Sequence, residues 1–181
     1  IDMEYSNWGK MGIIEPSDIA VAPNGDVYIA DTGNNRIAVL DSDFQFKGQI
    51  ATPLLPDQSL GRISQPKGVF IDENGLVYIA DTGNNRIVCL DRYYKFKFEI
   101  KNFVNEQGVP DGFSGVSGLF VNDKYIYACD TNNARVVIFD TKGNFIKTVN
   151  QPESRLFNSD TIYRPIAIAV DTYGRLFIVS A

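Results

Sequence analysis

The stretch ADTGNNRI occupies Ala30–Ile37, recurs without change at Ala80–Ile87, and returns as CDTNNARV at Cys129–Val136. The aspartates of these three copies stand 50 and 49 positions apart. A fixed period of this length is typical of repeat architectures, in which each copy is one supersecondary unit. We therefore interpret the chain as an array of one unit, with a partial fourth copy in which Ser180 stands at the aspartate position.

The element signals within a copy are all of the β type. Residues 18–22 (DIAVA) and 26–30 (DVYIA) favour strands, and they flank an Asn-Gly turn, which strongly indicates a tight hairpin. We expect a third strand at 36–40 and a fourth around Phe46, with equivalents in the later copies. Four antiparallel strands in about 40–50 residues are typical of one blade of a β-propeller. No stretch keeps a helical period, which disfavours a helical solenoid.

The predicted fold class is therefore all-β: a β-propeller of four-stranded antiparallel blades, with about three and a half blades in this chain. The predicted divisions are an N-terminal arm at 1–15, full blades at 16–50, 66–100 and 116–149, and a partial blade at 165–181. Such an array does not close a ring, so we expect exposed apolar blade faces at its ends. Because these faces need to be covered, we expect the remaining blades to belong to a longer parent chain; the alternative is a second copy that completes a ring of about seven blades. The start at Ile1, without an initiator Met, is in line with a processed product or a fragment.

Composition excludes several classes of protein. The chain has 181 residues, 44% of them hydrophobic, which is enough to bury a core, and no apolar run is long enough to span a membrane. A net charge of −5 disfavours a nucleic-acid surface. The basic aromatic stretch 92–97 (RYYKFK) could stack bases, but an ordinary outer strand explains it. Cys89 and Cys129 lack the spacing of a disulfide or zinc site and are expected to be buried thiols.

A longer pattern, Pro-x-x-(β run)-x-Gly-x-(Val/Leu)-Tyr-Ile-Ala-Asp-Thr-Gly-Asn-Asn-Arg-Ile, resembles the NHL repeat, a family named for its Asn-His-Leu signature. The corresponding triplets here are Asn34-Asn35-Arg36, Asn84-Asn85-Arg86 and Asn133-Ala134-Arg135, without the histidine, as is common among bacterial members. The resemblance implies a propeller, usually of six blades, that binds proteins, RNA or carbohydrates, and it favours an extracytoplasmic location. Enzymatic relatives include a zinc-dependent amidating lyase and calcium-dependent gluconolactonase-like hydrolases. The fold alone does not decide between these functions.

The repeated motif itself is interpreted as structural. Its aspartates are expected to accept backbone N–H groups in Asx-type turns, its asparagines to adopt left-handed backbone geometry, and its arginines to pair with an aspartate of the same or the adjacent blade. A calcium loop is the alternative, but no bidentate Glu stands at the required distance. The predicted structural residues are Asp31, Asn34, Asn35, Arg36, Asp81, Asn84, Asn85, Arg86, Asp130, Asn133 and Arg135.

Ligand contacts are expected where the copies differ. The connections between blades, residues 51–65, 101–115 and 150–164, are longer than usual, and long connections often carry binding residues. We expect them on the same face as the Asp-Thr-x-Asn-Asn turns, around the mouth of the central channel. The predicted ligand-binding residues are Glu15, Asp57, Arg62, Gln65, Asn105, Glu106, Asp111, Phe113, Arg155, Phe157, Asp160 and Arg164.

The function predicted from these features is a non-enzymatic binding or scaffold module that recognises a protein or a polar, carbohydrate-like ligand through the interblade-loop face. This function needs no cofactor and no metal. The chain has no histidine, which excludes histidine-based catalysis and imidazole zinc ligands. The alternative is a calcium-dependent gluconolactonase-like hydrolase, whose metal would bind a carboxylate and amide cluster drawn from Glu15, Asn105, Asn158 and Asp160.

Overall fold

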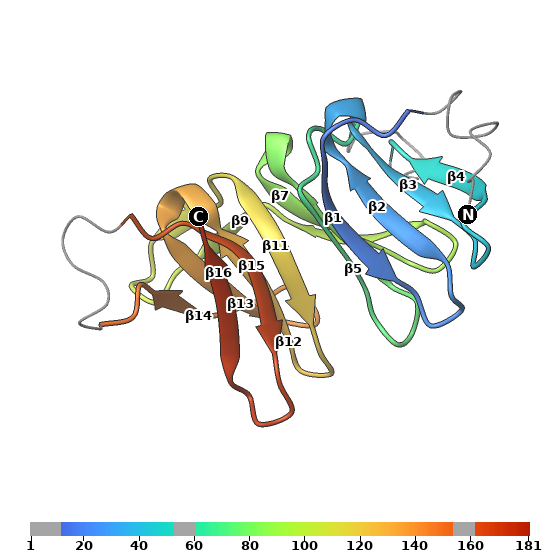
Figure 1. Cartoon of the computed structure of the whole chain (residues 1–181). Coiled ribbons are helices and arrows are strands. Elements are labelled where there is room, and N and C mark those ends of the chain that lie inside the picture. The colour runs from blue at the N-terminus through green and yellow to red at the C-terminus, as the bar shows by residue number, and fades with distance from the viewer. Residues whose placement is uncertain (1–11, 53–60, 154–161) are drawn as a thin grey trace.

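The computed structural model describes residues 12–52, 61–153 and 162–181, and it confirms the predicted all-β propeller architecture. Three four-stranded antiparallel sheets and a two-stranded sheet lie side by side as three blades and a half-blade (Figure 1). Blade 1 contains β1 (Pro16–Val21), β2 (Val27–Asp31), β3 (Arg36–Leu40) and β4 (Phe46–Ile50). Blade 2 contains β5 (Gly68–Ile71), β6 (Val77–Asp81), β7 (Arg86–Leu90) and β8 (Phe96–Ile100).

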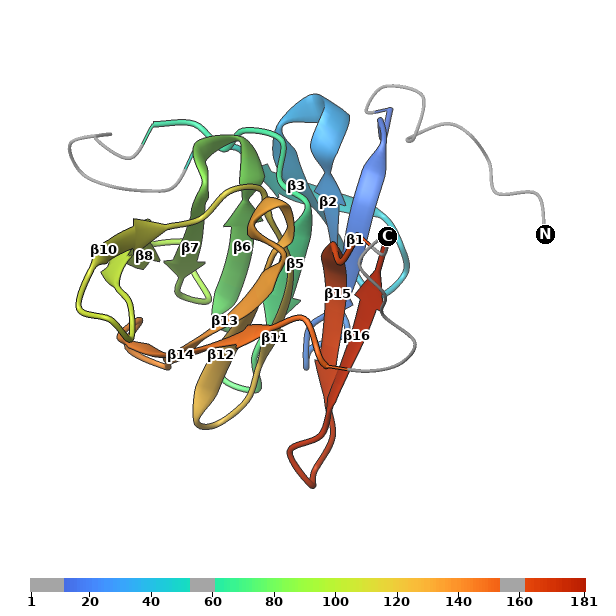
Figure 2. The same ribbon diagram turned by 90° about the vertical axis from the view of Figure 1, so that its left-hand side faces the viewer.

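The C-terminal part of the array repeats the same order of strands. Blade 3 contains β11 (Val116–Val121), β12 (Tyr125–Asp130), β13 (Arg135–Asp140) and β14 (Phe145–Asn150). The half-blade contains β15 (Pro165–Val170) and β16 (Leu176–Ser180). The first strands, β1, β5, β11 and β15, are neighbours from blade to blade on the inner side of the array (Figures 1 and 2). No helix among the described residues is long and apolar enough to cross a membrane.

Burial follows from the position of each blade in the array. In blade 2, β6 and β7 are buried at every position, because apolar side chains from blades on both sides cover them. At the ends of the array, one side is uncovered: Ile19 of β1 is 62% exposed, and Phe177 of β16 is 55% exposed. The predicted apolar end faces are therefore confirmed.

Two glycines allow the first strands to approach one another closely. A Cβ atom added at Gly68 would lie 2.2 Å from the backbone oxygen of Ser117, and one added at Gly118 would lie 2.6 Å from the oxygen of Ile166. Both distances are too short for any side chain. The inner strands of neighbouring blades therefore pack backbone against backbone.

The array has two faces, which differ in the turns they carry. One face, which we call the motif face, carries the turns between the second and third strands of the full blades. Each of these turns is a short 3-10 turn: η1 (Thr32–Asn34) between β2 and β3, η2 (Thr82–Asn84) between β6 and β7, and η3 (Thr131–Asn133) between β12 and β13. The opposite face, called the hairpin face, holds the β1–β2 and β3–β4 turns and their equivalents; it lies at the bottom of Figure 1. The residues after the 3-10 turns are left-handed, with φ of 55° at Asn35, 50° at Asn85 and 54° at Ala134. The predicted left-handed geometry is therefore confirmed for Asn35 and Asn85, the second asparagine of each pair, whereas Asn34, Asn84 and Asn133 belong to the 3-10 turns and have no positive φ.

The connection at 101–115 differs from its prediction. Rather than an open loop around the channel mouth, it contains a two-stranded hairpin of β9 (Asn102–Val104) and β10 (Pro110–Gly112) beside the outer strand β14. Phe103 of this hairpin stacks on Phe145, with ring centroids 5.4 Å apart. Burial of the Phe103 ring is the physical reason why the segment folds onto blade 3.

Candidate functional site

Each full blade contains one buried aspartate that accepts three hydrogen bonds. In blade 2, Asp81 is 0% exposed and accepts from the Arg86 guanidinium (Nε, 2.6 Å), from the Asn84 amide (2.9 Å) and from the backbone N–H of Ser64 (2.7 Å). The same three contacts recur at Asp31 and at Asp130. We call each such group an Asp–Arg cluster. The predicted pairing of arginine with aspartate within a blade is confirmed.

The predicted Asx-type turn is wrong at all three aspartates. None of them caps its own 3-10 turn; each accepts instead from a residue that precedes the first strand of its blade, namely Ile14, Ser64 and Ser114. The cause is strand register, because Pro16 is opposite Asp31 and Val116 is opposite Asp130. The chain that leads into the first strand therefore passes directly over the carboxylate.

Two other motif residues bind the following blade. Thr82 donates to the backbone oxygen of Val116 (2.6 Å), and Thr32 and Thr131 do the same to Pro66 (2.6 Å) and Pro165 (2.8 Å). The second asparagine accepts from a backbone N–H of the next blade: Asn35 from Gln65 (2.8 Å) and Asn85 from Gly115 (2.9 Å). The repeated motif therefore holds each blade together and fixes it to its successor.

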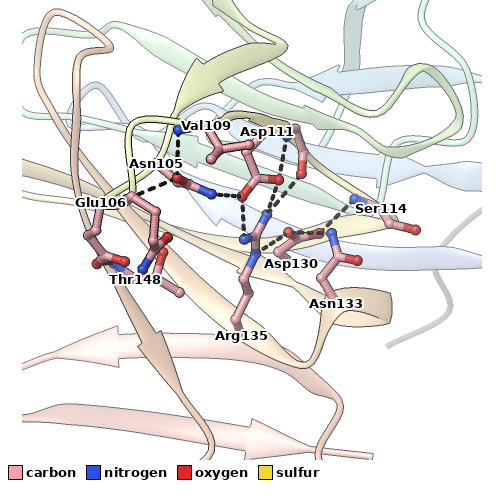
Figure 3. Close-up of polar contacts among 11 residues, drawn as sticks. Asn105, Glu106, Val109, Asp111, Ser114, Asp130, Asn133, Arg135 and Thr148 are labelled. Atoms are coloured by element: carbon pink, nitrogen blue, oxygen red, sulfur yellow. Dashed lines mark hydrogen bonds and ion pairs between the residues drawn. The ribbon is translucent and has the colours of Figure 1, made fainter.

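The third cluster is extended by the β9–β10 hairpin (Figure 3). Arg135 forms a two-pronged contact with Asp111, at 2.7 and 3.0 Å, in addition to its bond to Asp130. The Arg135 guanidinium lowers the pKa of the Asp111 carboxyl to about 2. Phe113 is 7% exposed and packs against Phe103 and Phe139. Asp111 and Phe113, predicted to bind ligand, therefore serve to anchor the hairpin.

Asn105 and Glu106 lie at the tip of the same hairpin. The Asn105 oxygen accepts from the backbone N–H groups of Gln107 and Val109, which closes the turn, and the Glu106 carboxylate accepts from the backbone of Thr148 in β14 (Figure 3). Both residues are thus at the outer edge of blade 3, and they are not at the channel mouth where they were predicted. The Glu106 carboxylate therefore accepts a hydrogen bond from a backbone N–H group on the outer edge strand of blade 3, where no further strand pairs with it.

The remaining predicted residues fall into two groups. Glu15, Arg62, Gln65 and Arg164 are exposed on the motif face. Glu15 and Arg164 directly precede β1 and β15, and Gln65 lies three residues before β5. Gly115 holds the equivalent position before β11. Backbone φ is left-handed at Glu15 (49°), Gln65 (44°) and Gly115 (70°). Asp57, Arg155, Phe157 and Asp160 lie outside the described residues, as does Asn158.

Sequence reasoning missed one residue of this face, Asn132. Its amide oxygen accepts from the Arg164 guanidinium at 3.2 Å, which joins the η3 turn to the chain before β15. The signal was present in the sequence, because the other two copies have Gly33 and Gly83 at this position.

The structure does not assemble the calcium site of the alternative function from the residues it describes. Glu15 precedes β1 of blade 1, whereas Asn105 lies at the outer edge of blade 3, and blade 2 stands between them. Among residues 12–52, 61–153 and 162–181, no three His, Cys, Asp or Glu side chains are grouped to hold a metal ion.

Comparison with known proteins gives a family match and several similar folds. A family model, the NHL repeat, matches residues 14–40 and 64–90. No curated protein matches the sequence. A streptogramin B lyase structure is 19% identical over 91% of this chain, with a TM-score of 0.66. Hydrazine synthase of Kuenenia stuttgartiensis is 16% identical over 93% (TM-score 0.64), and glutaminyl cyclase of Myxococcus xanthus is 15% identical over 94% (TM-score 0.61).

These structural similarities establish the fold and leave the activity open. The aligned region covers 48% of the lyase, 43% of the synthase and 69% of the cyclase, so the chain spans about half the length of the first two. Proteins that share a fold at such low sequence identity need not share an activity.

Proposed function

Because this chain is an NHL-repeat β-propeller protein, we propose that it is a binding or scaffold module that recognises a protein or a polar, carbohydrate-like ligand through its motif face. The residues proposed to make contact are Glu15, Arg62, Gln65 and Arg164. Asp57, Arg155, Phe157 and Asp160 belong to the same predicted surface in the sequence.

The observation that supports this proposal is that corresponding positions ahead of the first strands, Glu15, Gln65 and Arg164, carry different side chains. Glu15 and Gln65 hold a left-handed backbone, a conformation that costs a residue other than glycine about 1–2 kcal/mol. The N–H of Gln65 is fixed to Asn35, and Arg164 is fixed to Asn132 and Ser180. The blades therefore present different side chains from corresponding positions. The hydrogen-bonded backbones of Gln65 and Arg164 reduce the conformational entropy that is lost when a ligand binds, which favours selective binding.

The face carries both signs of charge, with Glu15 negative and Arg62 and Arg164 positive. Mixed polar surfaces of this kind suit a protein edge or a polar ligand. No contact among the described residues favours the hydrolase alternative.

The proposal can be tested by screening the chain against arrays of proteins, glycans and RNA. We expect Arg62→Ala and Arg164→Ala to weaken binding of any hit at least tenfold, and Lys142→Ala, an exposed lysine on the hairpin face, to leave it unchanged. Retained binding in both arginine variants would contradict the site. Hydrolysis of a lactone that is lost on chelation of calcium would favour the alternative function.

A further inference from the structure

A groove of about 560 Å³ runs between blades 1 and 2 on the hairpin face, on the opposite side of the array from the motif face. One wall is formed by the β1–β2 turn with Lys47 of β4, and the other by the β5–β6 turn and the β7–β8 turn. Its volume lies within the range of ligand pockets, about 300–1,000 Å³.

The blade 1 wall of the groove contains a buried aspartate, Asp26, that blade 2 lacks at the corresponding position. Asp26 has only 8% of its side chain exposed, and its carboxylate accepts from Lys47 (2.6 Å) and from the Asn24 amide (2.8 Å). The equivalent position in blade 2 holds an apolar residue, Leu76. A buried aspartate here is therefore a local feature of this groove, and the frame of the blade does not require it.

The blade 2 wall departs from the repeat at three consecutive residues. Arg92, Tyr93 and Tyr94 stand where blade 1 has Ser-Asp-Phe and blade 3 has Thr-Lys-Gly. Tyr94 is left-handed, with φ of 63°, and its hydroxyl shares a hydrogen bond with the hydroxyl of Tyr28 across the groove (3.1 Å). This contact fixes the turn in place.

The fixed turn presents an aromatic ring to solvent beside an unpaired cation. Tyr93 is 69% exposed, and the Arg92 guanidinium lies 6.0 Å from its ring centroid. Within the described ranges, Arg92 forms no ion pair or hydrogen bond. Its five N–H donors and the ring of Tyr93 are therefore available at the mouth of the groove.

We propose that this groove binds a neutral saccharide. A sugar ring has an apolar C–H face that packs on an exposed aromatic ring, and a rim of hydroxyl groups that both donate and accept hydrogen bonds. Tyr93 supplies the ring, Arg92 supplies donors, and Glu73 and Asn74 of the neighbouring β5–β6 turn supply acceptors. The lining charges cancel, since Lys47 and Arg92 balance Asp26 and Glu73, which favours a neutral ligand over an anion or a cation.

The test is titration calorimetry of the whole chain with neutral hexasaccharides of glucose, xylose and N-acetylglucosamine, together with hexagalacturonate and a chitosan hexamer as charged probes. We expect at least one neutral probe to bind. Tyr93→Ala should weaken that binding at least tenfold, and Arg92→Ala at least threefold, whereas Tyr93→Phe should retain it. Circular dichroism confirms that each variant is folded.

Tyr173→Ala is the matched control, because Tyr173 is 84% exposed and also has a guanidinium, that of Arg175, 5.4 Å from its ring. It lies on the half-blade, away from the groove. Binding should be unchanged in this variant and in Arg164→Ala, which affects only the proposed motif-face site. The proposal would be overturned if the chain bound only the charged probes or bound no probe. It would also be overturned if Tyr93→Ala bound the neutral probe as tightly as the unaltered chain.

Discussion

Replacing Asp81 with asparagine should separate the electrostatic role of the Asp–Arg cluster from its packing. Asp81 is fully buried, and Arg86, which bonds to it, has 6% of its side chain exposed. Asparagine has nearly the same size, and its oxygen can still accept from Ser64. Its amide group, however, would face the Arg86 donor with another donor, and the negative charge would be gone.

Removing one partner of a buried ion pair costs about 3–5 kcal/mol, because the other charge remains uncompensated. Arg86 keeps a second partner, since Glu99 lies 3.1 Å from its Nη1 atom and is one-third exposed. We therefore expect the free energy of unfolding to fall by about 3 kcal/mol, the lower end of this range. With a urea m-value of about 2 kcal/mol/M, the unfolding midpoint should fall by about 1.5 M.

The assay is equilibrium unfolding in urea followed by circular dichroism. Asp123→Asn is the control, because it removes the same charge from an exposed turn and should change stability by less than about 0.5 kcal/mol. Adding Arg86→Met to Asp81→Asn should recover part of the loss by removing the uncompensated charge. If the single variant loses less than about 1 kcal/mol of stability, or the double variant recovers none of the loss, the Asp81–Arg86 ion pair does not have this electrostatic role.

Two further predictions concern other contacts. Gly68→Ala should destabilise the chain by about 1–3 kcal/mol because its Cβ would collide with the backbone of Ser117, whereas Gly48→Ala, with open space around it, should be nearly neutral in the same urea assay. The pKa of Asp111 is lowered to about 2 in the folded chain, so its pairing with Arg135 contributes stability above the unfolded pKa and loses it as pH falls from about 4 to about 2. Unfolding measured across that window should show a shallower decline for Asp111→Asn; an unchanged slope would argue against the pair.

The features that could be predicted from the sequence are those that recur at a fixed spacing. The hairpin turns, the strands and the pairing of Arg36 with Asp31 all join residues close in sequence, and repetition separates such signals from chance. The backbone partner of Asp31 could not be predicted in the same way. It lies 17 residues earlier, at Ile14, and is set by strand register, which the motif does not encode.

The site was harder to predict because its residues depend on neighbours from other segments. Phe113 was expected at the surface, but a pocket formed by Phe103 and Phe139 buries it. Tyr93 was explained by the alternation of an outer strand. Only the structure places it across a groove from Asp26, which is 67 positions earlier in the sequence.

The forward bonds of Thr32 and Thr82 have a consequence for how such an array grows. Each copy of the motif carries the groups that attach it to whatever copy comes next, so a tandem duplication of any stretch of about 50 residues would insert a new blade with its attachments already in place. Recombination between copies is therefore a route by which an array of this kind can gain or lose blades.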